Sequence, residues 1–423
     1  MLNRKRFLII FIVSLVAIAA TLYFKTPETW KVIELGRIHQ SVINDFIFSP
    51  DGKIIATSND REVTLWNLEA EQIRTLSSDT TKAKIKSFVF SPDGQLMVTA
   101  SNTGVTLWNT QGKQLWTSPF ITEFVAFHPD GKMIVALGNK EVKLWNLNGE
   151  EIQTLHHEET IEYFRFSLDG QTIATLSRQE VKLWSRSGEE LQILKRSGLT
   201  NPFGFSTSKA YGFYGLFEYV TFSPDGRTII TIDSGNVNLW SKEGKLLRNL
   251  STLMAYTVAP NSNNTAILTS HPEGARLWNY QGKLLYVFKH HAYRPLVVRW
   301  SPDNQIVATG GSSGVRLWNA EDGKRIQTLP RISLWNSLVD IDDYSCEAVS
   351  FSSNGEIIAA ICKFFYGSDV FKNGLRLWSR DGQELWTPDE NGYDSYVFSP
   401  DSQTLAVKHE GQLILLKLSV RKR

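Results

Sequence analysis

Short apolar runs alternate with polar turns along most of the chain, and one order of runs keeps returning. An apolar run ending in an aromatic residue leads into Ser-Pro-Asp-Gly, and a second apolar run, a Leu-Trp pair and a fourth run follow. In the first copy, at 43–76, Val63 and Leu65 alternate with Thr64 and Trp66, so large side chains load both faces of one sheet. This pattern predicts four short strands joined by turns.

The pattern occurs nine times, and two marker positions identify each copy. The aromatic marker falls at Phe48, Phe90, Phe127, Phe166, Phe222, Val258, Trp300, Phe351 and Phe398, and the tryptophan marker at Trp66, Trp108, Trp145, Trp184, Trp240, Trp278, Trp318, Trp378 and Leu416. A small sheet with two apolar faces needs a neighbour on each side, and a ring supplies both. We therefore expect an all-β fold, a propeller of nine four-stranded blades. The sixth copy, at 258–262, is the weakest, so eight blades with one aberrant copy remain an alternative.

The two ends of the repeated region complement each other. The ninth copy stops after its third run at 413–418, whereas the segment 30–35 reads like the fourth run of other copies, such as 151–155. Pairing this first segment with the last blade would close the ring and leave no open edge. We expect a propeller domain over 29–423, preceded by a separate segment at 1–28.

The repeated motif resembles the WD40-repeat family over residues 29–418. Most copies have Trp-Asn or Trp-Ser where the family has Trp-Asp, and the first copy alone keeps the family's hydrogen-bonded set, at His39, Ser58, Asp60 and Trp66. The resemblance assigns these residues to bracing a blade from inside. It does not make His39, Ser58 and Asp60 a catalytic triad, because geometry rather than residue type defines a triad.

The first 28 residues differ from the repeats. Arg4, Lys5 and Arg6 precede an uncharged run from Phe7 to Phe24, which as a helix is about 27 Å long and just spans a bilayer. The positive flank should stay in the cytoplasm and export the propeller, which predicts a single-pass membrane protein with a cytoplasmic N-terminus and an extracytoplasmic propeller. A cleaved signal peptide is the rival, because Ala17-Ile18-Ala19 resembles a cleavage site; the domain would then be secreted or periplasmic.

Composition excludes several kinds of activity. The formal net charge is +2 and no basic stripe interrupts the repeats, which argues against a nucleic-acid partner. The sequence has no phosphate-binding glycine loop, zinc spacing or nucleophile elbow, so we expect no cofactor, no metal and no catalytic residue. The histidine pairs at 156–157 and 290–291 are adjacent on strands, where neighbours point to opposite faces and do not chelate one ion easily.

The two cysteines, Cys346 and Cys362, both fall in the eighth copy, on its first and second runs. A register that pairs Phe351 with Ile357 places them opposite each other, so a disulfide is geometrically conceivable in an oxidising compartment. The alternative is two buried small apolar side chains, which a register shift of one residue would produce.

Three segments exceed the standard repeat length: 196–218, 330–345 and 364–373. The first two join a fourth strand to the next first strand and the third joins a second strand to a third, so all three should emerge on one face. Their large side chains favour order and function over disorder. The candidate partner-binding residues are Trp335, Leu334, Asp342, Asp343, Phe213, Tyr214, Phe365 and Tyr366.

Trp335 alone among the tryptophans has no place in the repeat. Exposed aromatic anchors dominate protein interfaces, although a side chain tucked under its own loop is an equal alternative here. The acidic residues Asp342 and Asp343 beside it would suit a basic partner.

These features favour a membrane-tethered, non-catalytic scaffold that binds a protein or peptide partner on the face bearing the insertions. The family resemblance carries most of this inference, and fold alone does not give function. The alternative is a propeller enzyme or small-ligand receptor that uses the central funnel; a purely structural role is a third reading. Because the closing strand and the C-terminal tail both meet the face that carries the Ser-Pro-Asp-Gly hairpins, we expect that face to be directed toward the membrane. The insertions should then be directed away from it.

Overall fold

The computed structural model describes residues 29–40, 42–77, 83–177, 180–195, 220–233, 235–250, 255–289, 297–311, 314–329, 344–366, 369–386 and 392–421. These residues form strands β1 to β36 and contain no helix. Within these ranges there is accordingly no helix long and apolar enough to cross a bilayer. The anchor or signal segment expected at 1–28 lies outside them.

The strands build nine sheets of four antiparallel strands each. Blade 1 contains β2 (Asp45–Phe48), β3 (Ile55–Ser58), β4 (Glu62–Trp66) and β5 (Gln72–Ser77). Blade 2 contains β6 (Ile85–Phe90), β7 (Leu96–Ser101), β8 (Gly104–Asn109) and β9 (Gln114–Ser118). Blade 3 contains β10 (Phe124–Phe127), β11 (Met133–Leu137), β12 (Glu141–Asn146) and β13 (Glu151–His156). Blade 4 contains β14 (Ile161–Phe166), β15 (Thr172–Ser177), β16 (Glu180–Ser185) and β17 (Glu190–Lys195).

Blade 5 contains β18 (Val220–Phe222), β19 (Thr228–Asp233), β20 (Asn236–Ser241) and β21 (Leu246–Asn249). Blade 6 contains β22 (Val258–Pro260), β23 (Ala266–His271), β24 (Gly274–Asn279) and β25 (Leu284–Lys289). Blade 7 contains β26 (Val297–Trp300), β27 (Ile306–Gly311), β28 (Gly314–Asn319) and β29 (Arg325–Thr328). Blade 8 contains β30 (Tyr344–Phe351), β31 (Ile357–Tyr366), β32 (Asp369–Ser379) and β33 (Glu384–Trp386). Blade 9 contains β34 (Tyr393–Phe398), β35 (Thr404–His409) and β36 (Gln412–Arg421), and its fourth strand is β1 (Thr29–Ile38).

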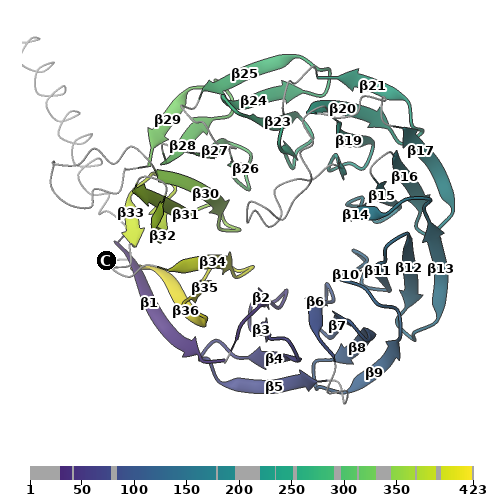
Figure 1. The fold of residues 1–423 in the computed structure, drawn as a ribbon. Coiled ribbons are helices and arrows are strands. Elements are labelled where there is room, and N and C mark those ends of the chain that lie inside the picture. The colour runs from purple at the N-terminus through teal and green to yellow at the C-terminus, as the bar shows by residue number, and fades with distance from the viewer. Residues whose placement is uncertain are drawn as a thin grey trace, which may run out of the picture.

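The blades stand around a central axis as a β-propeller, and the first and last strands, β1 and β36, lie side by side in blade 9 (Figure 1). Strand β1 pairs with β36 from Thr29 opposite Arg421 to Ile38 opposite Leu413, with a bulge between Glu34 and Gly36. The expected ring closure and the count of nine blades are therefore confirmed.

Each pair of neighbouring blades shares one apolar cluster, nine in all within the described residues. The Leu-Trp motif explains this arrangement, because adjacent residues on a strand point to opposite faces. In blade 2, Trp108 packs into the cluster shared with blade 1, and Leu107 packs into the cluster shared with blade 3. In blade 9 Leu416 replaces the tryptophan and faces blade 8, while Leu415 faces blade 1.

The sixth copy folds as a blade, but its aromatic marker was wrongly aligned. Pro260, not Val258, lies opposite Ile267, as Phe48 lies opposite Ile55 in blade 1. A proline donates no hydrogen bond and is tolerated on the first strand because that strand is an edge of its sheet. Because a proline occupies the aromatic position, the motif is hard to recognise in the sixth copy, although the strand is present.

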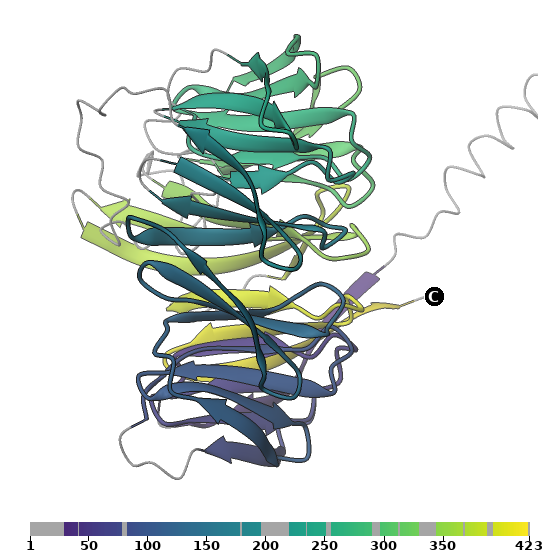
Figure 2. The same ribbon diagram turned by 90° about the vertical axis from the view of Figure 1, so that its right-hand side faces the viewer.

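The two faces of the ring differ in the connections that they carry. We call the hairpin face the one with the turns between first and second strands and between third and fourth strands; the connection face is opposite. The start of β1 and the end of β36 reach the hairpin face, whereas the extended β31–β32 pair projects from the connection face (Figure 2). The termini of the propeller and its longest hairpin therefore lie on opposite faces.

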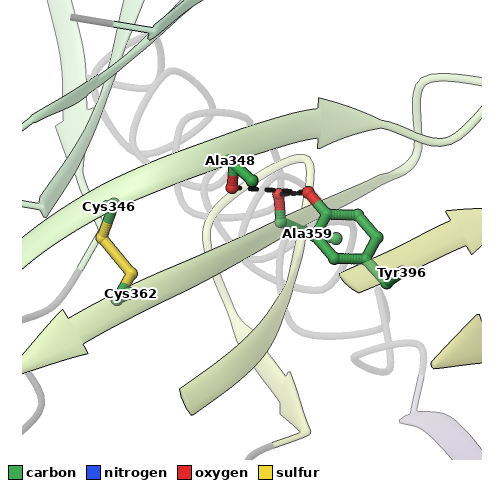
Figure 3. The surroundings of a disulfide bond; sticks show 5 residues. All are labelled: Cys346, Ala348, Ala359, Cys362 and Tyr396. Carbon is green, nitrogen blue, oxygen red and sulfur yellow. Dashed lines mark hydrogen bonds between the residues drawn. A yellow bond between two sulfur atoms is a disulfide. The ribbon is translucent and has the colours of Figure 1, made fainter. Parts of the chain in front are cut away.

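Cys346 and Cys362 form a disulfide, with the two sulfur atoms 2.05 Å apart (Figure 3). The two residues are direct cross-strand partners, although Phe351 pairs with Ile358 and not with Ile357 as expected. A bulge between Cys346 and Ala348 shifts the register by one residue and restores the opposition of the cysteines. The residue pattern of the two strands does not indicate that bulge.

Tyr396 of blade 9 fastens the same part of blade 8. Its hydroxyl donates to the carbonyl of Ala359 at 2.8 Å (Figure 3) and accepts a hydrogen bond from the Ser350 hydroxyl at 3.0 Å. Burial raises the pKa of the Tyr396 phenol, so the hydroxyl stays protonated and keeps its donor. The disulfide and this tyrosine together hold β30 and β31 of blade 8.

Removing the disulfide should destabilise the ring. With Cys346→Ala and Cys362→Ala together, the free energy of unfolding is expected to fall by about 2–4 kcal/mol, because the unfolded chain regains the conformational entropy that the cross-link removes. Urea denaturation of the oxidised parent, the reduced parent and the double variant measures this. The reduced parent should have the same urea midpoint as the double variant. A parent whose urea midpoint does not change when reductant is added would contradict this account.

Candidate functional site

A buried threonine joins the second strand of most blades to the tryptophan of the third. In blade 1, the indole N–H of Trp66 donates to Thr57 Oγ1 at 2.8 Å, and the Thr57 hydroxyl donates to Gln40 Oε1 at 2.7 Å. Six tryptophan–threonine pairs of this kind occur in the described residues: Trp66–Thr57, Trp108–Thr99, Trp184–Thr175, Trp240–Thr231, Trp278–Thr269 and Trp318–Thr309. Each bond satisfies an indole donor that burial would otherwise leave unpaired.

The expected set of His39, Ser58 and Asp60 around Trp66 takes a different form. His39 is exposed, and Gln40 beside it reaches Thr57 instead. Thr57 replaces Ser58, because a shift of one residue along a strand moves a side chain to the other face. The sequence did contain the signal, since the threonine lies nine residues before the tryptophan in all six pairs.

Asp60 lies at the surface. Its carboxylate accepts a hydrogen bond from Asn44 Nδ2 at 2.9 Å and lies 3.5 Å from the Lys84 ammonium, and these contacts lower the pKa of Asp60. Its partners are thus other than the histidine and serine of a triad. The arrangement braces a blade and offers no activated nucleophile.

His157 takes the position of Gln40 in blade 4. Its Nε2 lies 2.6 Å from Thr175 Oγ1, which also accepts from the Trp184 indole at 2.7 Å. Burial, and secondarily the Lys182 ammonium, lowers the pKa of His157 to about 4. The imidazole is therefore neutral at physiological pH and acts as a structural link.

The buried imidazole makes stability depend on pH. Because the folded pKa of about 4 lies below the unfolded value of 6.5, the unfolded state binds the extra proton and stability falls as pH drops from 6.5 toward 4. The loss is expected to reach about 3 kcal/mol. His157→Gln copies the chemistry of blade 1, and its unfolding free energy should decline less over that window. Identical pH profiles for parent and variant would refute this role.

The Ser-Pro-Asp-Gly turns on the hairpin face use their carboxylates internally. In blade 1, the Ser49 hydroxyl donates to Asp51 Oδ1 at 2.6 Å, and the backbone N–H of Lys53 donates to the same oxygen at 3.1 Å. These bonds lower the pKa of Asp51, with the serine making the largest contribution. The recurring aspartates are therefore turn-forming residues rather than a metal site, and no group of three or more metal-ligating side chains occurs in the described part of the chain.

Neighbouring turns also touch one another around the hairpin face. Gly52 has φ of +72°, and a side chain there would meet the Asp401 carboxyl carbon of blade 9 at 3.6 Å. Between blades 5 and 6, Asn264 Nδ2 donates to Asp225 Oδ2 at 2.7 Å. Between blades 7 and 8, the Arg380 guanidinium donates to Asp303 at 2.5 Å. The hairpin face is thus a continuous ring of connected turns.

The candidate partner-binding residues were expected to lie on one face, the connection face. Trp335, Leu334, Asp342, Asp343, Phe213 and Tyr214 lie outside the described residues. Phe365 and Tyr366 lie within β31, although their side chains are outside the description. These residues remain candidates for partner binding.

The segment 364–373 was expected to be an inserted loop, and this was wrong. Phe364 pairs with Lys372, Phe365 with Val370 and Tyr366 with Asp369, so the segment continues β31 and β32. Aromatic and β-branched residues favour strands, and β30 lengthens the sheet further by pairing Tyr344 with Phe364. The result is a β-hairpin on the connection face.

The outer edge of this hairpin is open within the described residues. Strand β33 pairs with Leu377 and Trp378, and no described strand pairs with β32 from Asp369 to Leu375 on this side. An open edge of this kind offers unpaired N–H and C=O groups to another strand. Sequence reasoning missed it, because the fourth run at 384–386 looks like the others.

Repeats of the WD domain, G-beta repeat family match residues 32–67, 70–109, 118–146 and 282–319. Among solved structures, the chain is similar to a crystal structure of the eukaryotic initiation factor, with a TM-score of 0.63 and 14% identity over 86% of this chain and 95% of that one. It is also similar to the C-terminal WD40 domain of Sif2, with a TM-score of 0.57 and 15% identity over 93% and 99% of the two chains. No curated protein matches.

Geometry and comparisons define the class of protein as a nine-bladed β-propeller held by internal hydrogen bonds. The chain contains WD40 repeats, as the resemblance implied, and its fold is shared by solved WD40 propellers. WD40 propellers generally serve as platforms for protein partners and are typically not enzymes.

Proposed function

We propose that this protein is a membrane-tethered, non-catalytic scaffold that binds a protein or peptide partner on its connection face outside the cytoplasm. The long β31–β32 hairpin of blade 8 carries the proposal. Its strands have 10 and 11 residues, whereas the second strands of blades 1 to 7 and 9 have 4 to 6. A ring needs only the shorter length, so the excess serves another purpose.

The hairpin suits an extended peptide. An added strand can pair with the open edge of β32, and alternate side chains then give specificity. Aromatic residues near the tip, Phe365 and Tyr366, are the residue types that dominate binding energy at interfaces. The Cys346–Cys362 disulfide lies at the base of the hairpin, where Cys362 also pairs with Gly374 of β32. The strands start from a fixed base, which lowers the entropy lost on binding.

The position of the chain ends supports the orientation. The apolar run from Phe7 to Phe24 ends five residues before Thr29, where β1 starts on the hairpin face. A retained anchor would hold that face toward the bilayer and present the hairpin to the opposite side (Figure 2). Alkaline extraction of membranes tests the anchor separately, since a cleaved signal would release the propeller.

Site-specific photocrosslinking in intact membranes tests the partner surface. A photoreactive residue at Tyr366 is expected to give one discrete adduct, whereas the same residue at Lys53 on the hairpin face, with its side chain 80% exposed, gives none. A variant carrying the photoreactive residue at Phe364, with residues 365–371 replaced by Asn-Gly to close a tight hairpin, should lose the adduct formed at Phe364 in the full-length hairpin.

Equal adducts at both faces, or an adduct that survives the shortened hairpin, would contradict a partner site on the hairpin. Expression and the urea midpoint of the shortened variant serve as controls, because the pairs from Lys363 to Ile357 remain intact.

A further inference from the structure

The turns between third and fourth strands differ in charge around the ring. In blades 5, 6 and 7, these turns and the first half of the strands after them carry exposed basic residues: Lys242, Lys245, Arg248, Lys283, Lys324 and Arg325. The equivalent turns and strands of blades 1, 3 and 4 carry Glu69, Glu71, Glu150, Glu151, Glu189 and Glu190, with Arg74 and Arg186 as exposed basic residues among them. We call the outer rim of blades 5 to 7 the basic sector; it follows β21, β25 and β29 around the ring (Figure 1).

Acidic residues offset only part of this charge. Glu243, Glu321 and Asp322 lie in the same turns, against the six basic residues. Asp322 lies 3.0 Å from the Lys324 ammonium and raises the pKa of that lysine. The sector therefore keeps a net positive charge although the whole chain has a net charge of only +2.

Exposed aliphatic side chains accompany the basic residues. Leu246 and Leu247 are 47% and 38% exposed, and Leu284 and Leu285 are 40% and 37% exposed. The position of Leu246 and Leu284, opposite the tryptophan of the third strand, is polar on other outer strands, where it holds Gln72, Glu151, Glu190 and Arg325. The position of Leu247 and Leu285 is apolar and exposed on those strands too, as Ile73, Ile152, Leu191 and Ile326. Blades 5 and 6 thus each expose one more apolar side chain at the start of the outer strand, Leu246 and Leu284, than blades 1, 3 and 4 do.

We propose that the basic sector contacts the anionic headgroups of the bilayer and tilts the propeller toward the membrane on that side. This inference rests on the tether of the proposed function. The turns of the sector lie on the hairpin face, the same face at which the tether enters β1. Basic residues interspersed with leucines suit a lipid interface, where the charges meet headgroups and the leucines meet the acyl boundary. The glutamates of blades 1, 3 and 4 are repelled by the same headgroups, which fixes the direction of the tilt.

A pair of matched labels measures the tilt. Gln281 in blade 6 and Asn148 in blade 3 each precede the glycine of the equivalent turn, and both are exposed. The two native cysteines are bonded to each other, so Gln281→Cys or Asn148→Cys introduces a single free thiol for a fluorescent donor. The full chain is reconstituted into vesicles of phosphatidylcholine, with or without phosphatidylglycerol, that contain an acceptor-labelled lipid.

With phosphatidylglycerol, energy transfer from position 281 is expected to exceed that from position 148. The difference should vanish in pure phosphatidylcholine and at high salt, because screening shortens the reach of the charges. Lys245→Glu, Lys283→Glu and Lys324→Glu together should also abolish it. Lys53→Glu, Lys113→Glu and Lys132→Glu change the net charge equally, lie on hairpin-face turns outside the sector, and should leave it intact.

Equal transfer from both positions, or a difference that the sector variant retains, overturns the proposal. So does a difference caused by pairing of two copies, which dilution of the protein in the vesicles would remove. Failure of the full chain to insert overturns the tether and this inference together, whereas the crosslinking experiment at Tyr366 reports on the partner surface independently.

Discussion

The ring depends on one interaction, the packing of the Leu-Trp pair of the third strand against the two neighbouring blades. In blades 1 to 8 its leucine packs toward the next blade and its tryptophan toward the preceding one, so a single pair contributes to two apolar clusters. No blade covers both of its own faces, and every blade therefore requires two neighbours. The buried tryptophan in turn needs a hydrogen-bond acceptor, which a threonine on the second strand supplies in six blades.

This constraint divides the molecule into a structural face and a variable face. On the hairpin face, the serine and aspartate of six turns bond to each other and neighbouring turns touch, so most of the recurring polar residues already have partners. On the connection face, the blades are free to differ in length, as the β31–β32 hairpin does. The basic sector lies on the outer wall, where the core packing leaves charge unconstrained.

The repeat made the fold predictable, because the spacing of Phe48 and Trp66 recurs wherever a blade must meet its neighbours. Positions set by one-residue differences were less predictable. Pro260 occupies the aromatic position of β22 and made that strand hard to recognise, and the bulge after Cys346 changed the register of β30 and β31. In blade 1, Gln40 and Thr57 make the contact that was expected of His39 and Ser58. The segment that contains Phe365 and Tyr366 was predicted from the excess length of the eighth copy. Pairing with β30 and β32 makes it part of a β-hairpin rather than a loop. The partner residues at Trp335 and Phe213 lie outside the described residues and stay predictions.

Closure of the ring by β1 is the most direct test of the account, because the clusters on both sides of blade 9 include residues of β1. Ile33 and Lys417 are cross-strand partners between β1 and β36, and both are exposed. Replacing both by cysteine and oxidising the folded protein is predicted to give a disulfide within one chain, identified by peptide mass spectrometry. Absence of that bond, or its formation only between two chains, would contradict a ring that closes on its own first strand.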